Sequence, residues 1–129
     1  MILAIDPGKY KCGLAVLDEN GGVATRAVVP RDELIKRLNP LLAAYQPTAI
    51  VIGRSASGQT VEREIGQLGL KANIIFVSER ESSRQARVRF WRDNPPRGWL
   101  KLIPTSLRVP PVPIDDLAAV IIGERYLAA

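Results

Sequence analysis

The chain has 129 residues and a mass of 14.1 kDa, which suffices for one hydrophobic core but not for a two-lobed enzyme. Its 18 Lys and Arg against 13 Asp and Glu give a net charge of +5, which favours an anionic partner. With no histidine and a single cysteine, Cys12, it lacks the groups for histidine-dependent catalysis, a histidine-ligated zinc site or an internal disulfide. Carboxylates, amines, hydroxyls and a hard metal ion remain as means of catalysis.

Two further features concern location. The sequence has no apolar run approaching the roughly 18 residues of a membrane span. Its amino terminus lacks the basic segment and long apolar stretch of a secretion signal, and one cysteine fits reducing surroundings. We therefore expect a cytoplasmic protein with no membrane association.

The first half of the chain predicts an antiparallel meander of three strands, followed by a helix and a buried strand. The meander strands are expected at residues 2–6, 12–17 and 23–29. Asn20-Gly21-Gly22 marks the turn before the third strand. Residues 34–45 have helical apolar spacing, and Pro40 predicts a kink in that helix. The apolar run at 49–53 is typical of a strand buried on both faces of a parallel sheet.

In the second half, helices and strands alternate. Residues 61–68 have helical spacing, and the apolar run at 74–77 predicts a fifth strand. A serine at 82 or 83 can cap a helix that runs to about residue 91. A last helix is expected at 117–127, buried over its first half because apolar residues lie nearly all round it.

These elements predict a single α/β domain over residues 1–129, in which helices flank a five-stranded mixed sheet of the antiparallel meander and two parallel strands. Because six of the ten prolines fall between residues 95 and 113, a Pro-rich basic loop is expected at about 93–113. Ligands of such sheets bind at the carboxyl ends of the parallel strands. Asp6 closes the first strand and Glu79 follows the fifth, so both acids are expected at that edge.

A basic segment follows the fifth strand. Between Arg84 and Arg108 there are seven basic residues and one acid, Asp93, and both tryptophans lie in this stretch. Charges that follow phosphates and rings that stack on bases favour a groove for single-stranded or distorted nucleic acid. A solvated basic face with a few buried rings would have the same composition.

The acids have functional and structural interpretations. Asp6, Gly8 and Gly13 form the pattern D-x-G-x-x-x-x-G, in which glycines allow backbone close to a ligand and the aspartate can hold a cation. Asp6 could instead satisfy the amides of its own turn. Glu79 could be an acid near a helix start, and Asp115 or Asp116 could cap the last helix.

If these carboxylates converge, they repel one another unless a cation lies between them. Oxygen ligands alone select Mg²⁺ or Mn²⁺ over zinc. Two such ions can activate water on one side of a phosphodiester and stabilise the leaving oxygen on the other. The sequence therefore predicts a metal-dependent phosphodiesterase that needs no histidine base.

Four segments resemble the YqgF/RuvX family of the ribonuclease H-like superfamily, a group of proposed pre-16S rRNA nucleases and Holliday junction resolvase-like proteins. The segments are Ile2–Val16, Ile50–Gly53, Ser78–Ala86 and Ile114–Leu127. The resemblance implies a five-stranded ribonuclease H-like fold and divalent-metal dependence. It also implies cleavage of structured nucleic acid, either in maturation of the 5′ end of precursor 16S rRNA or on branched DNA, and it is compatible with a homodimer.

By this resemblance Asp6, Glu79 and Asp115 take the catalytic, metal-binding positions, whereas Asp116 falls one place later. Basic, hydroxyl and aromatic residues are expected to bind the nucleic acid. They are Lys9, Lys11, Arg54, Arg80, Ser82, Ser83, Arg84, Arg87, Trp91, Arg97, Trp99 and Lys101.

The sequence departs from the family pattern in two places. Ser78 replaces an aspartate that usually precedes the glutamate, and the stretch at 53–58 is shorter than usual. Arg54 stands where a resolvase of the RuvC type is expected to have a glutamate, which favours the YqgF-like branch.

Two other functions fit parts of the sequence. The first motif is also similar to the phosphate-binding hairpin of actin-like and sugar-kinase ATPases, but those enzymes close two such domains over ATP. A nucleic-acid-binding module of the same fold without cleavage activity is the second alternative, and Ser78 is the feature that allows it.

Overall fold

The structure is a computed structural model that describes residues 1–80, 82–95, 98, 102, 110 and 113–128. Three residues expected to bind nucleic acid, Arg97, Trp99 and Lys101, lie outside the described residues, as does most of the predicted loop at about 93–113.

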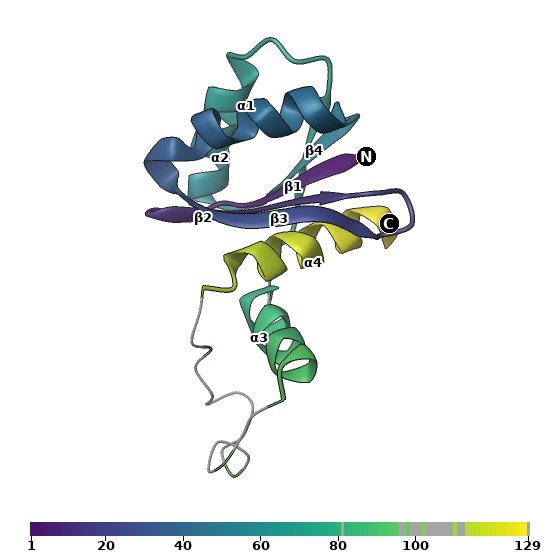
Figure 1. Cartoon of the computed structure of the whole chain (residues 1–129). Helices are drawn as coiled ribbons and strands as arrows, with labels where there is room; N and C mark the ends of the chain where they lie inside the picture. Colours follow the sequence, from purple (N-terminus) through teal and green to yellow (C-terminus); the bar gives the residue numbers. More distant parts are fainter. Residues whose placement is uncertain (81, 96–97, 99–101, 103–109, 111–112, 129) are drawn as a thin grey trace.

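One five-stranded mixed sheet forms the centre of the domain (Figure 1), in the order β3-β2-β1-β4-β5. The strands are β1 (Ile2–Asp6), β2 (Lys11–Leu17), β3 (Val23–Pro30), β4 (Ala49–Gly53) and β5 (Asn73–Val77). The first three are antiparallel neighbours, whereas β4 runs parallel to β1 and β5 runs parallel to β4. The predicted combination of a meander and two parallel strands is confirmed.

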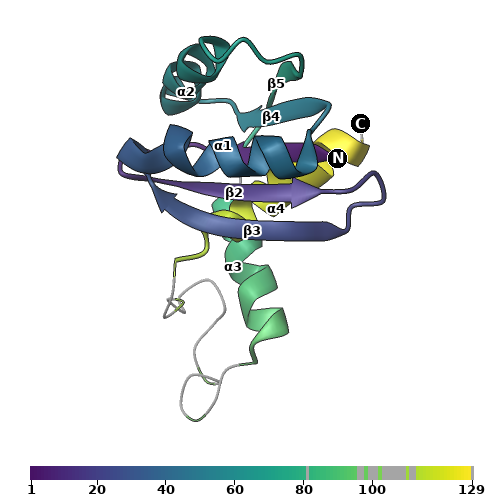
Figure 2. The ribbon, with the colours of Figure 1, turned by 45° about the horizontal axis from the view of Figure 1, so that its top comes forward.

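Helices cover both faces of the sheet (Figure 2). A 3₁₀ turn, η1 (Arg31–Glu33), leads into α1 (Leu34–Tyr45), and α1 and α2 (Ala56–Gly66) lie on one face. On the other face lies α4 (Asp115–Ala128), and α3 (Ser82–Asp93) packs on α4, farther from the sheet. Among the described helices, none combines the length and apolar character that a membrane crossing requires.

The helix bounds agree with the sequence expectation at residues 34–45 and differ from it at residues 61–68. The helix predicted at 34–45 is present and continues through Pro40 as one element. The helix predicted at 61–68 begins earlier, at Ala56, and ends at Gly66. Its start is set by Ser55, whose side-chain oxygen accepts a hydrogen bond from the Gly58 N–H at 3.0 Å.

The alternation of side chains along β1 divides the core into two layers. Leu3 and Ile5 pack with α1 and α2, whereas Ile2 and Ala4 pack with the apolar half of α4. Asp6 continues the second series, so its carboxyl group faces the α4 side. The fold thus places the last residue of β1 beside the start of α4, on the left of Figure 1.

Candidate active site

Asp6 lies at the carboxyl edge of the sheet between two glycines. On β2 its partner is Gly13. On β4, Ile52 pairs with Ile5, so Gly53 is the next residue on the other side of Asp6. Side chains of neighbouring strands on one face of a sheet are close enough for direct contact. Because Gly13 and Gly53 have no side chain, neither places one beside Asp6.

Each glycine makes room for a second acid. A Cβ atom on Gly53 would lie 2.4 Å from Oε2 of Glu79, so the Glu79 carboxylate occupies the space above β4. A Cβ atom on Gly13 would lie 1.8 Å from the carbonyl oxygen of Asp115, so the first turn of α4 lies directly on β2. The absence of two side chains thus brings acids from two distant segments towards Asp6.

This crowding of acids changes the protonation of Asp6. Burial, the charges of Glu79 and Asp115, and a hydrogen bond with Glu79 together raise the pKa of Asp6 to about 7, burial being the largest cause. Asp6 is not held by backbone amides of its turn, since none of the described residues donates such a bond. The turn-stabilising interpretation of Asp6 is therefore not supported.

Glu79 follows β5 and is half-buried. Burial raises the pKa of Glu79, and hydrogen bonds from Asp6 and Ser55 act in the opposite direction. Its Oε2 atom is buried and has no hydrogen-bond partner among the described residues. A buried acceptor without a donor is costly, and a cation between Glu79 and Asp6 would remove that cost.

Asp115 and Asp116 have different surroundings. The carboxylate of Asp115 lies 3.2 Å from the ammonium of Lys11, the first residue of β2. Asp116 lies 3.5 Å from the Arg26 guanidinium and accepts the N–H of Leu117 at 2.9 Å. Asp116 thus supports the start of α4, whereas Asp115 lies near enough to raise the pKa of Asp6.

The three acids do not form a finished ligand set. Within the described residues, no group of three or more His, Cys, Asp or Glu side chains is arranged to hold one metal ion. Asp6 and Glu79 form a close pair, and Asp115 lies beside them in an ion pair with Lys11. The chemistry of the donors, carboxylate oxygens with one buried and unsatisfied, fits Mg²⁺ or Mn²⁺.

Sequence reasoning missed Arg125, which holds the loop that carries Glu79. From α4, its guanidinium donates to the carbonyl oxygens of Ser78 and Arg80 at 2.8 and 2.7 Å. It also donates to the side-chain oxygen of Gln85 at 3.0 Å. Arg125 therefore fixes the backbone on both sides of Glu79 and ties it to α3. No local pattern around Arg125 signals this contact, because it joins segments far apart in sequence.

Three of the predicted nucleic-acid-binding residues lie in the turn and loops at the carboxyl edge of the sheet. Lys9 is in the β1–β2 turn, Arg54 follows β4 and Arg80 follows Glu79, and all three are exposed. None of them forms an ion pair within the part of the chain that the structure describes. Lys11 is exposed too, but its ammonium is paired with Asp115.

The predicted residues on α3 divide between interior and surface. Ser82 and Trp91 are buried, with exposed fractions of 3% and 8%. Ser82 donates its N–H to the Glu79 carbonyl at 3.0 Å, and Trp91 packs edge-on against Phe90. In this conformation these two side chains offer little surface to a nucleic acid, in line with the alternative of buried rings. Ser83 and Arg84 are exposed, and Arg87 is half-buried.

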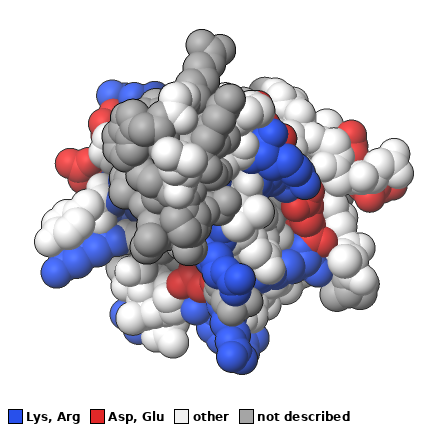
Figure 3. Space-filling model, turned by 90° about the horizontal axis from the view of Figure 1, so that it is seen from below, with Lys and Arg blue, Asp and Glu red and all other residues white. Residues whose placement is uncertain are grey.

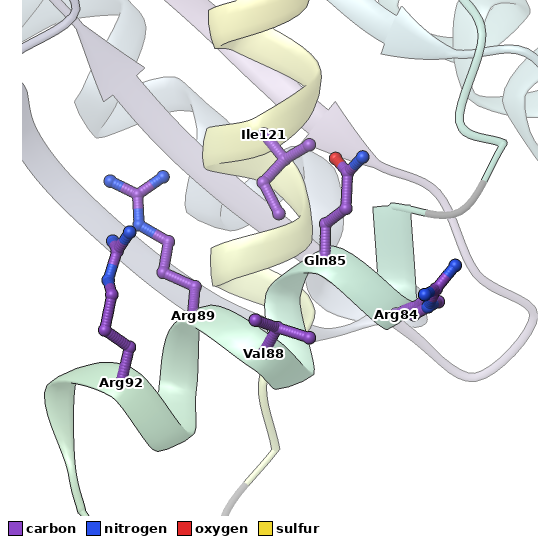
Figure 4. Close-up of a pocket in the computed structure, with 6 residues that line it drawn as sticks. All are labelled: Arg84, Gln85, Val88, Arg89, Arg92 and Ile121. Carbon is purple, nitrogen blue, oxygen red and sulfur yellow. The ribbon is translucent and has the colours of Figure 1, made fainter. Parts of the chain in front are cut away.

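A pocket of about 390 Å³ lies between α3 and α4 (Figure 4). It is lined by Arg84, Gln85, Val88, Arg89, Arg92 and Ile121. Arg89 is paired with Glu124 at 2.7 Å. Seen from the α3 side, blue Lys and Arg side chains lie at several places on this face, with red acidic ones among them (Figure 3). Basic side chains are therefore present on the same side of the sheet as α3 and α4.

The sheet order, the helices on both faces and the acids at the carboxyl edge define an α/β domain of the ribonuclease H-like class. A family model described as "RuvX: Holliday junction resolvase" matches residues 1–129, so the chain belongs to the RuvX family, also called YqgF. No curated protein matches the chain. The family supports the role of a nuclease similar to Holliday junction resolvases, with nucleic acid as the substrate.

Proposed function

We propose that the protein is a divalent-metal-dependent nuclease that hydrolyses phosphodiester bonds of structured nucleic acid. Its proposed substrates are the 5′ end of precursor 16S rRNA, branched DNA or both. The observation that carries the proposal is the half-buried carboxyl pair of Asp6 and Glu79, with Asp115 near it and exposed Lys and Arg side chains at the same edge of the sheet. Carboxylates placed side by side repel one another when both are ionised, and a cation between them would offset that repulsion.

Asp6, Glu79 and Asp115 would hold the metal. Bound Mg²⁺ or Mn²⁺ supplies an activated water and stabilisation of the leaving oxygen. A cation held there would lower the pKa of Asp6, because a positive neighbour favours the charged form of a carboxyl group. A metal held by Asp115 would compete with the Lys11 ammonium for that carboxylate, and the ammonium could then contact a phosphate of the substrate.

The ion pair of Lys11 with Asp115 favours the second candidate, a binding module without cleavage. In that case the Lys11 ammonium neutralises Asp115 in place of a metal ion. Ser78 then stands where an acid would help to bind a metal. The two candidates differ in one respect that can be measured, metal-dependent cleavage.

The test is incubation of the pure protein with single-stranded RNA, precursor rRNA ends and four-way DNA junctions, with Mg²⁺, Mn²⁺ or EDTA. The chain offers a matched pair of variants, Asp115→Asn and Asp116→Asn. We expect cleavage only with a divalent cation, its loss in Asp115→Asn, and its retention in Asp116→Asn. Analysis of the product ends identifies the bond that is cut.

Two results would contradict the proposal. Binding without cleavage of any substrate in the unmutated protein selects the binding module. Equal activity of both aspartate variants removes Asp115 from the site.

A further inference from the structure

The turn between β1 and β2 exposes an aromatic ring that the carboxylate site does not use. Tyr10 has an exposed fraction of 79%. The other aromatic side chains of the described residues are buried or half-buried. Exposing a ring to water costs free energy, so burial of the Tyr10 ring against a ligand would be favourable.

The backbone that carries Tyr10 is fixed. Its carbonyl accepts the Arg31 N–H at 2.8 Å, and the next residue, Lys11, pairs with Pro30 on β3. The Lys9 ammonium lies 5.5 Å from the centre of the Tyr10 ring, in a cation–π contact. A ring on a rigid backbone is preorganised for stacking, because little conformational entropy is lost when a ligand binds.

The Tyr10 ring lines an open pocket of about 500 Å³ whose other lining side chains carry charges of both signs. Its lining consists of Lys9, Tyr10, Arg31, Asp32 and Glu64. Arg31 and Glu64 neutralise each other at 2.9 Å, and Lys9 and Asp32 supply one charge of each sign. A phosphate site would have a positive excess. A neutral pocket with a ring, donors and acceptors instead suits a nucleobase, which stacks and forms hydrogen bonds through its edge.

The pocket adjoins the carboxylates across the edge of the sheet. Lys11, the first residue of β2, reaches Asp115 on the α4 side. Tyr10 precedes it and lines a pocket with residues of η1 and α2, on the opposite side. A nucleic-acid strand whose phosphodiester lies at Asp6 can therefore cross this edge and place a neighbouring base at Tyr10.

We propose that Tyr10 stacks on an unpaired nucleobase adjacent to the scissile phosphodiester, so that the site selects nucleic acid with an unpaired nucleotide at that point. This inference rests on the proposed nuclease function for the position of the phosphodiester. A base inside a continuous duplex is covered by its neighbours and cannot occupy the pocket without leaving the stack.

The test is binding in EDTA, where no cleavage occurs, to a duplex with an unpaired 2-aminopurine flank and to the same duplex with a paired flank. We expect Tyr10→Ala to weaken binding of the unpaired flank roughly tenfold, as for loss of one base–aromatic stack. It should also reduce the stacking-dependent quenching of 2-aminopurine fluorescence. Tyr10→Phe keeps the ring and should bind within about twofold of the unmutated protein. Binding of the paired flank should not change.

Leu70→Ala is the matched control, because Leu70 is an exposed apolar residue in a different pocket. The inference is overturned if Tyr10→Ala leaves binding and quenching unchanged, if it weakens both flanks equally, or if the protein binds neither flank. Failure of the proposed nuclease function is a separate result: no cleavage with Mn²⁺, although binding of the unpaired flank still depends on Tyr10.

Discussion

At the scale of single residues, the site is governed by the protonation of Asp6. A carboxyl group with a pKa of about 7 keeps its proton in the metal-free protein below that pH. The neighbouring Glu79 has a raised pKa for the same main reason, burial. Without a cation, this pair opposes folding whenever the pH is high enough to ionise both groups.

This arrangement predicts a pH dependence of stability in EDTA. Asp6 has a pKa of about 7 in the folded protein and an ordinary value of 3.8 in the unfolded chain, so between these values the folded protein binds more protons than the unfolded chain. The contribution of Asp6 to the free energy of unfolding is therefore complete below pH 3.8 and is lost as the pH rises through about 7. At about 1.4 kcal/mol for each pKa unit, the loss amounts to at most ~4 kcal/mol.

Asp6→Asn should remove most of this dependence and be more stable than the unmutated protein above about pH 7. Urea unfolding over a range of pH measures it, with Asp116→Asn as the control. Parallel curves for the unmutated protein and Asp6→Asn would show that Asp6 titrates normally.

A second residue-scale prediction concerns Arg125, which holds the backbone on both sides of Glu79 and is not one of the proposed metal ligands. Arg125→Met removes the three hydrogen bonds that hold the loop at Ser78 and Arg80. We expect Mn²⁺ affinity, measured by calorimetry, to fall roughly tenfold, as is usual when a residue that orients a ligand is lost. Arg63→Met, on the exposed surface of α2, is the control. Unchanged affinity in Arg125→Met would mean that the loop holds its shape without Arg125.

At the scale of elements, the site depends on how closely the loop after β5 and the first turn of α4 approach the sheet. Periodicity predicts these elements well, because each strand and helix buries one continuous apolar face. It does not predict the start of α2, which depends on the Ser55 cap, or the different surroundings of Asp115 and Asp116. These surroundings come from Lys11 and Arg26 on other strands.

Gly53→Ala tests the close approach of Glu79 to β4. The added methyl group would lie 2.4 Å from Oε2 of Glu79, so the carboxylate must leave its present position beside Asp6. We expect cleavage to fall by roughly 100-fold, since small displacements of reacting groups have large effects on rate. Gly66→Ala is the matched control, because its methyl group meets no atom within 4 Å. Equal activity of the two variants would show that the position of Glu79 over Gly53 is not needed.

At the scale of the whole molecule, the sequence predicts the sheet and the convergence of acids on one edge, since parallel strands end together. It does not predict which Lys and Arg side chains are available to contact a nucleic acid. Lys11, Arg26 and Arg89 are all paired with acids, whereas Arg54 and Arg80 have no ion pair within the described residues. The net charge of +5 therefore does not show where positive charge is available to a nucleic acid. Basic side chains in ion pairs offer less positive charge than their number suggests, whereas Arg54 and Arg80 offer theirs at the carboxyl edge.

Arg54→Ala and Arg80→Ala test this distribution. Each arginine that contacts a phosphate releases about one counterion, so each variant should reduce the slope of log K against log salt by about one. Arg37→Ala is the control, because Arg37 lies on α1 and is paired with Glu33. Fluorescence anisotropy with a labelled four-way junction measures the slopes. Equal slopes for all four proteins would place the nucleic acid elsewhere on the surface.

The most direct test of the site is calorimetric titration of the protein with Mn²⁺, in the absence of nucleic acid. If Asp6, Glu79 and Asp115 share the metal, the unmutated protein binds Mn²⁺ and releases protons near pH 7, while Asp6→Asn and Glu79→Gln bind far more weakly. Asp116→Asn should bind like the unmutated protein. Binding of Mn²⁺ with equal affinity by all four proteins would contradict the account.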